Sequence, residues 1–175
     1  MDNKQKRFYI EANDIKIAIS ILICILTYHF VPQLQILSAA TAALMCTQDT
    51  EKLSFKSGVT RTLGTIIAGL IAVAVLAIDS VIGNFYVLAV LVGVGIALAL
   101  AILRAMNVPA VVARVGAVTV VLITIITNIS AKAPISYVSY GVNRVIATAF
   151  GALVATGVSY IVNLVAKKKK VPVNK

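Results

Sequence analysis

The sequence predicts an all-α membrane protein with six transmembrane helices. Of its 175 residues, 60% are hydrophobic and 13% are charged, and the mean hydropathy is +0.99. A soluble domain is closer to half apolar and a quarter charged. The apolar residues also form long blocks. Between Arg61 and Arg104 the only charged residue is Asp79, which is typical of membrane-spanning helices. These observations exclude a soluble globular domain and a disordered chain.

Proline, glycine and polar residues delimit the apolar blocks. Six spans are predicted within a transmembrane domain of residues 15–166, at about 15–31, 35–48, 58–78, 85–103, 107–127 and 137–166. The second is short and rich in small side chains. The fifth is rich in Val, Ile and Thr, which would favour a strand in water, but a single open strand cannot cross a bilayer. We therefore expect helices throughout.

Two terminal segments flank this domain, a cytoplasmic or interfacial segment at residues 1–14 and a basic cytoplasmic tail at residues 167–175. With the N-terminus inside, most of the 16 Lys and Arg residues fall at the cytoplasmic ends of the spans, as the positive-inside rule requires. We expect a multi-pass protein of the cell membrane with both termini in the cytoplasm. The basic residues sit at the ends of apolar blocks and form no basic surface, so nucleic acid is not an expected partner.

Residues that could support catalysis are scarce. His29 is the single histidine, and Cys24 and Cys46 fall inside apolar blocks without a metal-binding spacing. The sequence has no nucleophile triad, zinc-protease motif, phosphate-binding loop or dinucleotide-binding glycine pattern. We expect that the protein is not an enzyme and that it uses no metal or other cofactor.

Two stretches align without gaps at an offset of 83 residues. Residues 58–61 (Gly-Val-Thr-Arg) match residues 141–144 (Gly-Val-Asn-Arg), and the matches continue with Thr65 and Thr148, Leu70 and Leu153, Ala72 and Ala155. A unit of three spans that is repeated once must reverse its direction. The second copy is then inverted in the membrane, as in many secondary transporters. Chance similarity between two helices rich in Gly and Ala is the alternative.

Three arginines are candidates for substrate binding, namely Arg61, Arg144 and Arg114. An ionisable side chain within a span is costly and by default marks a functional site. A guanidinium binds a carboxylate through two parallel hydrogen bonds, so three arginines with few acidic neighbours favour an anionic ligand. The Leu, Ile and Val side chains of the spans would supply apolar walls. Alternatively, Arg61 extends its charge to the cytoplasmic surface.

Three polar residues are further candidates for substrate contact, namely Gln48, Thr65 and Thr148. The two threonines each follow a candidate arginine by one turn, on the same helical face. Gln48 ends a thin polar stripe that begins with Ser38 and Thr41. For Ser38 and Thr41 we favour hydrogen bonds to neighbouring backbone groups. The small residues between these positions also favour close helix packing.

Around Ala39–Ala72 the chain resembles the aromatic acid exporter family, the fusaric-acid-resistance-like bacterial membrane proteins. The resemblance rests on the small-residue run at 38–42 and on a specific spacing of polar and glycine residues, which comprises Lys16, Gln48, Thr50, Ser54, Gly58, Arg61, Gly64, Thr65 and Gly69. It implies a bacterial inner-membrane exporter of small organic anions, in particular aromatic carboxylic acids. Family members usually carry a sizeable cytoplasmic domain, whereas nine residues follow Ala166 here. A non-transporting scaffold or an accessory subunit of a larger transport complex is therefore the alternative.

We also expect a homo-oligomer within the lipid bilayer. Six helices, one of them short, enclose little volume. The stripes Gly93-x-x-x-Ala97 and Gly95-x-x-x-Ala99 would allow helices of different copies to approach closely.

Overall fold

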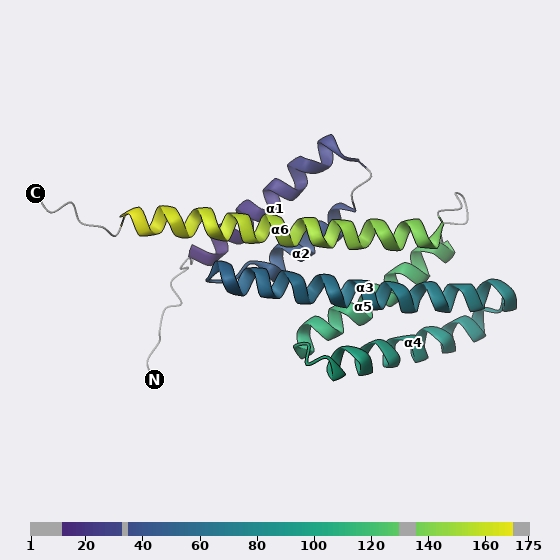
Figure 1. Cartoon of the computed structure of the whole chain (residues 1–175). Helices are drawn as coiled ribbons and strands as arrows, with labels where there is room; N and C mark the ends of the chain where they lie inside the picture. The colour runs from purple at the N-terminus through teal and green to yellow at the C-terminus, as the bar shows by residue number, and fades with distance from the viewer. Residues whose placement is uncertain (1–11, 33–34, 130–135, 170–175) are drawn as a thin grey trace, which may run out of the picture.

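The computed structural model describes residues 12–32, 35–129 and 136–169, and every regular element in these ranges is a helix (Figure 1). The helices are α1 (Ala12–Phe30), α2 (Ile36–Cys46), α3 (Glu51–Ile82), α4 (Phe85–Ala105), α5 (Ala110–Ile129) and α6 (Tyr137–Lys169). The predicted all-α class is confirmed, and five of the helices are long and apolar enough to cross a membrane. Residues 12–14 and 167–169 belong to α1 and α6, and the rest of the predicted terminal segments lies outside the described residues.

The helix α2 is shorter than the predicted second span. Its 11 residues extend about 16 Å at 1.5 Å per residue, roughly half of the hydrocarbon core. The residues on either side of α2 are bonded to α6, one near its start and one near its end. Gln35 Nε2 donates to the carbonyl of Tyr140 near the start of α6, and Asn163 near the end of α6 donates to the carbonyl of Asp49. Five of the six predicted spans thus correspond to long helices, and the second, which was predicted to be short, is a helix of about half the length needed to span.

The helix α3 begins earlier than predicted. Thr50 caps its N-terminus by accepting a hydrogen bond from Leu53 N, and Glu51 lies in the first turn, where a negative charge favours the helix. Residues 51–57, which precede the predicted third span, are therefore helical. The helix ends at Gly83, whose φ of 62° is left-handed and suits glycine at this position.

The helices α3 and α6 run antiparallel along each other in the middle of the bundle (Figure 1). The helix α2 packs on α6 and α5 packs on α3, while α1 contacts α2 and α6, and α4 contacts α3 and α5. The remaining contacts join α2 with α3 and α5 with α6. Exchanging α1 with α4, α2 with α5 and α3 with α6 leaves the α3–α6 contact unchanged and converts each of the other contacts into another of them.

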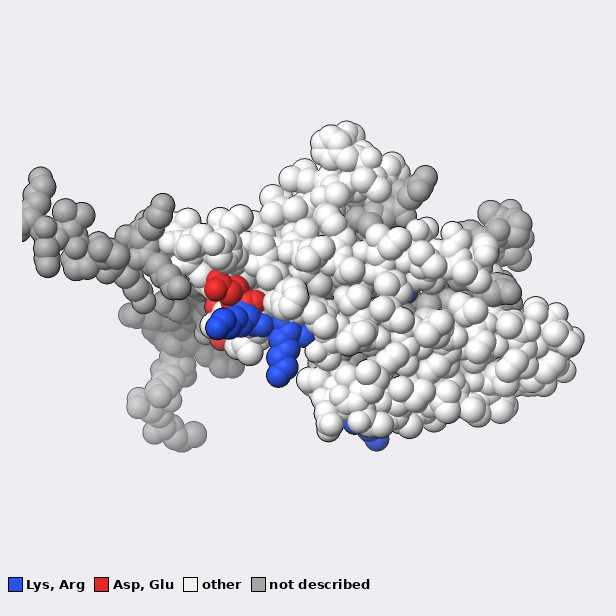
Figure 2. Space-filling model, viewed as in Figure 1, with Lys and Arg blue, Asp and Glu red and all other residues white. Residues whose placement is uncertain are grey.

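The start of α1, the start of α3 and the end of α6 lie together at one end of the bundle. The carbonyl of Asp49 accepts hydrogen bonds from Lys16 Nζ of α1 (3.1 Å) and from Asn163 Nδ2 of α6 (3.2 Å). We call this end the basic end, and the opposite end, which holds Gly83, the turn end. Figure 2 shows charged side chains gathered where α3 begins, beside a broad and almost uncharged surface. Which side of the membrane the basic end faces stays a prediction.

One of the two predicted oligomer stripes packs inside the chain. Gly95 and Ala99 are buried, and a Cβ added at Gly95 would lie 3.1 Å from Val75 and 3.3 Å from Ile71 of α3. The small side chains therefore bring α4 close to α3 within one copy. Gly93 and Ala97 are exposed, and the oligomer itself stays a prediction.

Candidate anion-binding site

Arg61 lies well inside α3 and is only 6% exposed. Its guanidinium points to α2, where Nη1 donates to Met45 Sδ (2.7 Å) and Nη2 donates to Thr41 Oγ1 (3.3 Å). Its Nε is buried and has no hydrogen-bond partner among the described residues. The guanidinium is thus held inside the bundle and does not extend to the surface, the alternative that the sequence left open.

Arg144 is half-buried on α6. The phenol of Tyr140, one turn earlier, interacts with its guanidinium, while Nε is buried without a partner in the described part of the chain. Arg61 and Arg144 are close enough for their charges to repel each other. The partners that the structure gives to both guanidinium groups are neutral. Buried charges are costly unless an opposite charge pairs with them, so this interior favours an anion.

Thr65 and Thr148 are buried beside the two arginines. Each hydroxyl donates to the carbonyl of the arginine one turn earlier, Thr65 to Arg61 at 3.0 Å and Thr148 to Arg144 at 2.8 Å. The two repeat positions therefore make the same bond. Because each hydroxyl hydrogen is used by its own helix, neither threonine offers a donor to an anion in this structure.

Of the two hydrogen bonds to backbone groups that were expected for Ser38 and Thr41, the structure shows one. Thr41 Oγ1 donates to the carbonyl of Ser38 (3.1 Å), as predicted, and it also accepts the hydrogen bond from Arg61. Ser38 instead bonds to the side-chain oxygen of Gln35 (3.2 Å). Thr41 is thus the member of the stripe that touches the candidate site.

Two predicted site residues lie apart from the paired arginines. Arg114 is exposed on α5, and the structure does not bring it to Arg61. Gln48 is exposed at the basic end, where it lines a hollow with Lys56 and Asn107. Its Nε2 reaches back to the carbonyl of Met45 (3.4 Å).

Sequence reasoning gave no role to three residues at or near the site, although one of them, Lys16, was among those that carry the family resemblance. Met45 and Tyr140 contact the two arginines and carry no signal in an apolar sequence. Lys16 is 5% exposed, and its Nζ holds the connection between α2 and α3 through the carbonyl of Asp49. A charge at the start of the first span was the signal that could have identified Lys16, because buried ammonium groups need hydrogen-bond acceptors.

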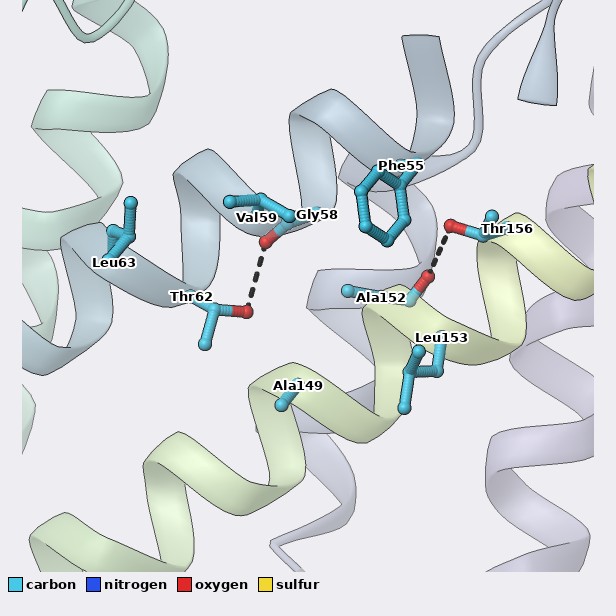
Figure 3. A pocket seen from close by; sticks show the side chains of 9 residues that line it. All are labelled: Phe55, Gly58, Val59, Thr62, Leu63, Ala149, Ala152, Leu153 and Thr156. Carbon is cyan, nitrogen blue, oxygen red and sulfur yellow. Dashed lines mark hydrogen bonds between the residues drawn. The ribbon is translucent and has the colours of Figure 1, made fainter. Parts of the chain in front are cut away.

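Two apolar cavities lie along the seam between α3 and α6, one of about 270 Å³ and one of about 350 Å³. The smaller is lined by Phe55, Gly58, Val59, Thr62, Leu63, Ala149, Ala152, Leu153 and Thr156 (Figure 3). The larger is lined by Val138, Gly141, Val142, Val145, Ile146, Ile66, Gly69, Leu70 and Val73. Each of the nine residues of one cavity stands 83 positions from a residue of the other, in the order given.

The polar atoms of the smaller cavity are satisfied by its own helices. Thr62 donates to the carbonyl of Gly58, and Thr156 donates to the carbonyl of Ala152 (Figure 3). Both hydroxyl hydrogens are therefore engaged by the backbone, and the cavity offers mainly apolar surface. The two cavities suit hydrocarbon or ring groups and not charged groups.

Comparison with known proteins agrees with the predicted resemblance. A family model described as fusaric acid resistance protein-like matches residues 22–158, a range that includes both paired arginines and both seam cavities. No curated protein and no solved structure matches the chain significantly. The match confirms the family that the residues at 39–72 indicated, and it implies a general role in membrane transport or efflux. The chain belongs to the family of fusaric acid resistance protein-like membrane proteins.

Proposed function

We propose that the protein exports small organic anions, in particular aromatic carboxylates, and that Arg61 and Arg144 bind the carboxylate. The observation that carries this proposal is the pair of guanidinium groups inside the bundle, each with a buried Nε that lacks a partner among the described residues. A carboxylate supplies the missing opposite charge and can accept two hydrogen bonds from one guanidinium. The two seam cavities, which are almost wholly apolar, suit an aromatic ring.

Two features support an inverted repeat of residues 12–82 and 85–169 as the basis of transport. The helix contacts are preserved when the two halves are exchanged, and the linings of the two seam cavities correspond at the offset of the sequence match. The antiparallel course of α3 and α6 fits copies of opposite orientation. Inverted repeats that exchange their conformations open a central site first to one side and then to the other.

The basic end faces the cytoplasm in this proposal, because the Lys and Arg bias favours that orientation. The substrate is then taken up at the basic end and released at the turn end. Both termini lie inside the cell, and the protein is a multi-pass component of the cell membrane.

Export from proteoliposomes tests the role of the arginines. Arg144→Lys and Arg61→Lys keep the positive charge but remove the planar two-pronged contact. Losing a charge-assisted hydrogen bond costs about 1.5–3 kcal/mol, so we expect roughly 10- to 100-fold weaker binding of a radiolabelled aromatic carboxylate. Its rate of export from the proteoliposomes should fall by a similar factor when the substrate is not saturating. Arg114→Lys is the matched control, because Arg114 is exposed and apart from the pair, and it should leave transport unchanged.

Equal transport by Arg144→Lys and the wild type, at equal protein level, would remove Arg144 from the site. Absence of transport of any aromatic carboxylate by the wild-type protein would favour the scaffold or accessory-subunit alternative. The corresponding carboxamide, which carries no charge, should not be transported.

A further inference from the structure

A hollow of about 510 Å³ opens at the basic end, between the first turns of α3, the end of α2 and the connection from α4 to α5. Its lining combines polar and apolar side chains, namely Gln48, Lys56, Ser57, Thr60 and Asn107 with Leu53, Leu63, Met106, Val108, Pro109 and Val112. It differs in this respect from the seam cavities, which are almost wholly apolar. A cation, amides and hydroxyls beside an apolar wall suit a ligand that has one anionic and one hydrocarbon part.

Met45 connects this hollow to Arg61. The carbonyl of Met45 accepts hydrogen bonds from two residues that line the hollow, Gln48 Nε2 and Ser57 Oγ, each at 3.4 Å. On its other side, Met45 Sδ accepts the hydrogen bond from Arg61 Nη1. Met45 does not itself line the hollow. Met45 is thus bonded to residues that line the hollow through its backbone carbonyl and to the buried guanidinium through its side chain.

The contact between Met45 and Arg61 is a weak one for a charged donor. A thioether sulfur is a poor hydrogen-bond acceptor, whereas a carboxylate is a strong one for guanidinium. Methionine is unbranched and has three rotatable side-chain bonds, so its side chain can move without a change of the helix. An anion that reaches Arg61 from the hollow can thus replace the sulfur.

We propose that this hollow is the site where the organic anion first binds at the basic end, and that the Met45 side chain is a displaceable plug between the hollow and Arg61. Lys56 attracts the anion, and the apolar wall holds its hydrocarbon part. The identity of the ligand class rests on the proposed function, but the path from the hollow to Arg61 is tested without transport.

The test uses a cysteine at Thr65, which is 6% exposed and bonds to the carbonyl of Arg61, in a chain without the native cysteines. The probe is an anionic thiol reagent, sulfonatoethyl methanethiosulfonate, which is applied from the side of the basic end. We expect slow modification of Thr65→Cys when Met45 is present, severalfold faster modification with Met45→Ala, and slow modification with Met45→Leu, which keeps the bulk of the plug.

The charge of Lys56 is tested with the same reaction. Lys56→Gln should slow modification by the anionic reagent by roughly tenfold, the lower range of electrostatic steering, and should not slow a cationic aminoethyl reagent. Lys52→Gln, one turn earlier and outside the lining of the hollow, is the matched control and should change neither rate.

Equal rates of cysteine modification with Met45, Met45→Ala and Met45→Leu would overturn the proposal that Met45 blocks the path to Arg61. Equal effects of Lys56→Gln on both reagents, or of Lys52→Gln and Lys56→Gln on the anionic one, would overturn the anion site. These outcomes are independent of the export assay. If the hollow fails this test while Arg144→Lys still weakens export as predicted, the proposed function survives with another path to Arg61.

Discussion

The two ends of the α3–α6 seam have matching sequences but different packing. At the basic end Gly58 lies against Ala152, so closely that an added Cβ would come within 2.8 Å of the Ala152 Cβ. The matching residues nearer the turn end are Gly141 and Gly69, and no atom of another described helix lies within 4 Å of a Cβ added at either. The seam is therefore tight at one end and loose at the other.

Polar contacts reinforce the tight end. Ser54 Oγ and Ser159 Oγ lie 3.1 Å apart and are fully buried, and Ser54 also accepts a hydrogen bond from Gln48 N (2.9 Å). The residue 83 positions before Ser159 is Leu76, which cannot form such a pair. If the halves are an inverted repeat, the structure shows one conformation of the exchange, in which the basic end of the seam is closed and the turn end is open. The turn end would then close by packing alone.

Adding one methyl group to each matching glycine should give the largest difference between the two ends. Gly58→Ala forces α3 and α6 apart, and overpacking of this kind costs about 1–3 kcal/mol. Gly141→Ala places its methyl group in open space and should be nearly neutral. Thermal unfolding in detergent should therefore show a clear decrease of the melting temperature for Gly58→Ala alone. Equal decreases in the two variants would show that the seam is not closed at one end only.

The hydroxyl pair at the tight end should contribute a smaller amount. A double-mutant cycle with Ser54→Ala and Ser159→Ala is expected to give a coupling energy of about 0.6 kcal/mol, the average for hydrogen bonds between membrane helices. Ser54→Ala alone should cost more than Ser159→Ala alone, because only Ser54 also holds Gln48 N. Ser80→Ala is the control, because Ser80 is exposed and bonds to its own helix. A coupling energy of zero would remove this pair as a cause of closure.

The positions of the helices could be predicted from the sequence because Pro, Gly and charged residues interrupt the apolar blocks. The extent of two helices could not. The apolar pattern at 35–48 does not reveal that α2 ends before Thr47, which has an extended backbone. The charges of Lys52 and Lys56 hid the early start of α3, although Thr50 and Glu51 are residues that favour a helix N-terminus. The cost of charge in a membrane made Arg61 a candidate, and the packing of the helices decides between its two predicted positions in favour of the interior.

The direction in which each site residue faces was beyond the sequence. In a helix that is apolar on all sides, periodicity does not distinguish the face toward lipid from the face toward protein. Arg114 was therefore grouped with Arg61 and Arg144, although it is exposed on α5. For the same reason, nothing in the sequence marked Met45 as the neighbour of Arg61. Only the packing of α2 against α3 and α6 brings these residues together.

Disulfide trapping of the two ends tests the proposed exchange of states most directly. In a chain without native cysteines, one variant carries Gly58→Cys with Ala152→Cys, and the other carries Gly69→Cys with Gly141→Cys. The first pair is already close. The second pair lines one cavity, so a disulfide between its members requires α3 and α6 to approach each other near the turn end. We expect both pairs to form disulfides in membranes, an aromatic carboxylate to change the fraction of each, and either disulfide to stop export until it is reduced. A Gly69–Gly141 pair that never closes in exporting protein, or full export with that pair linked, would contradict transport by exchange of the two halves.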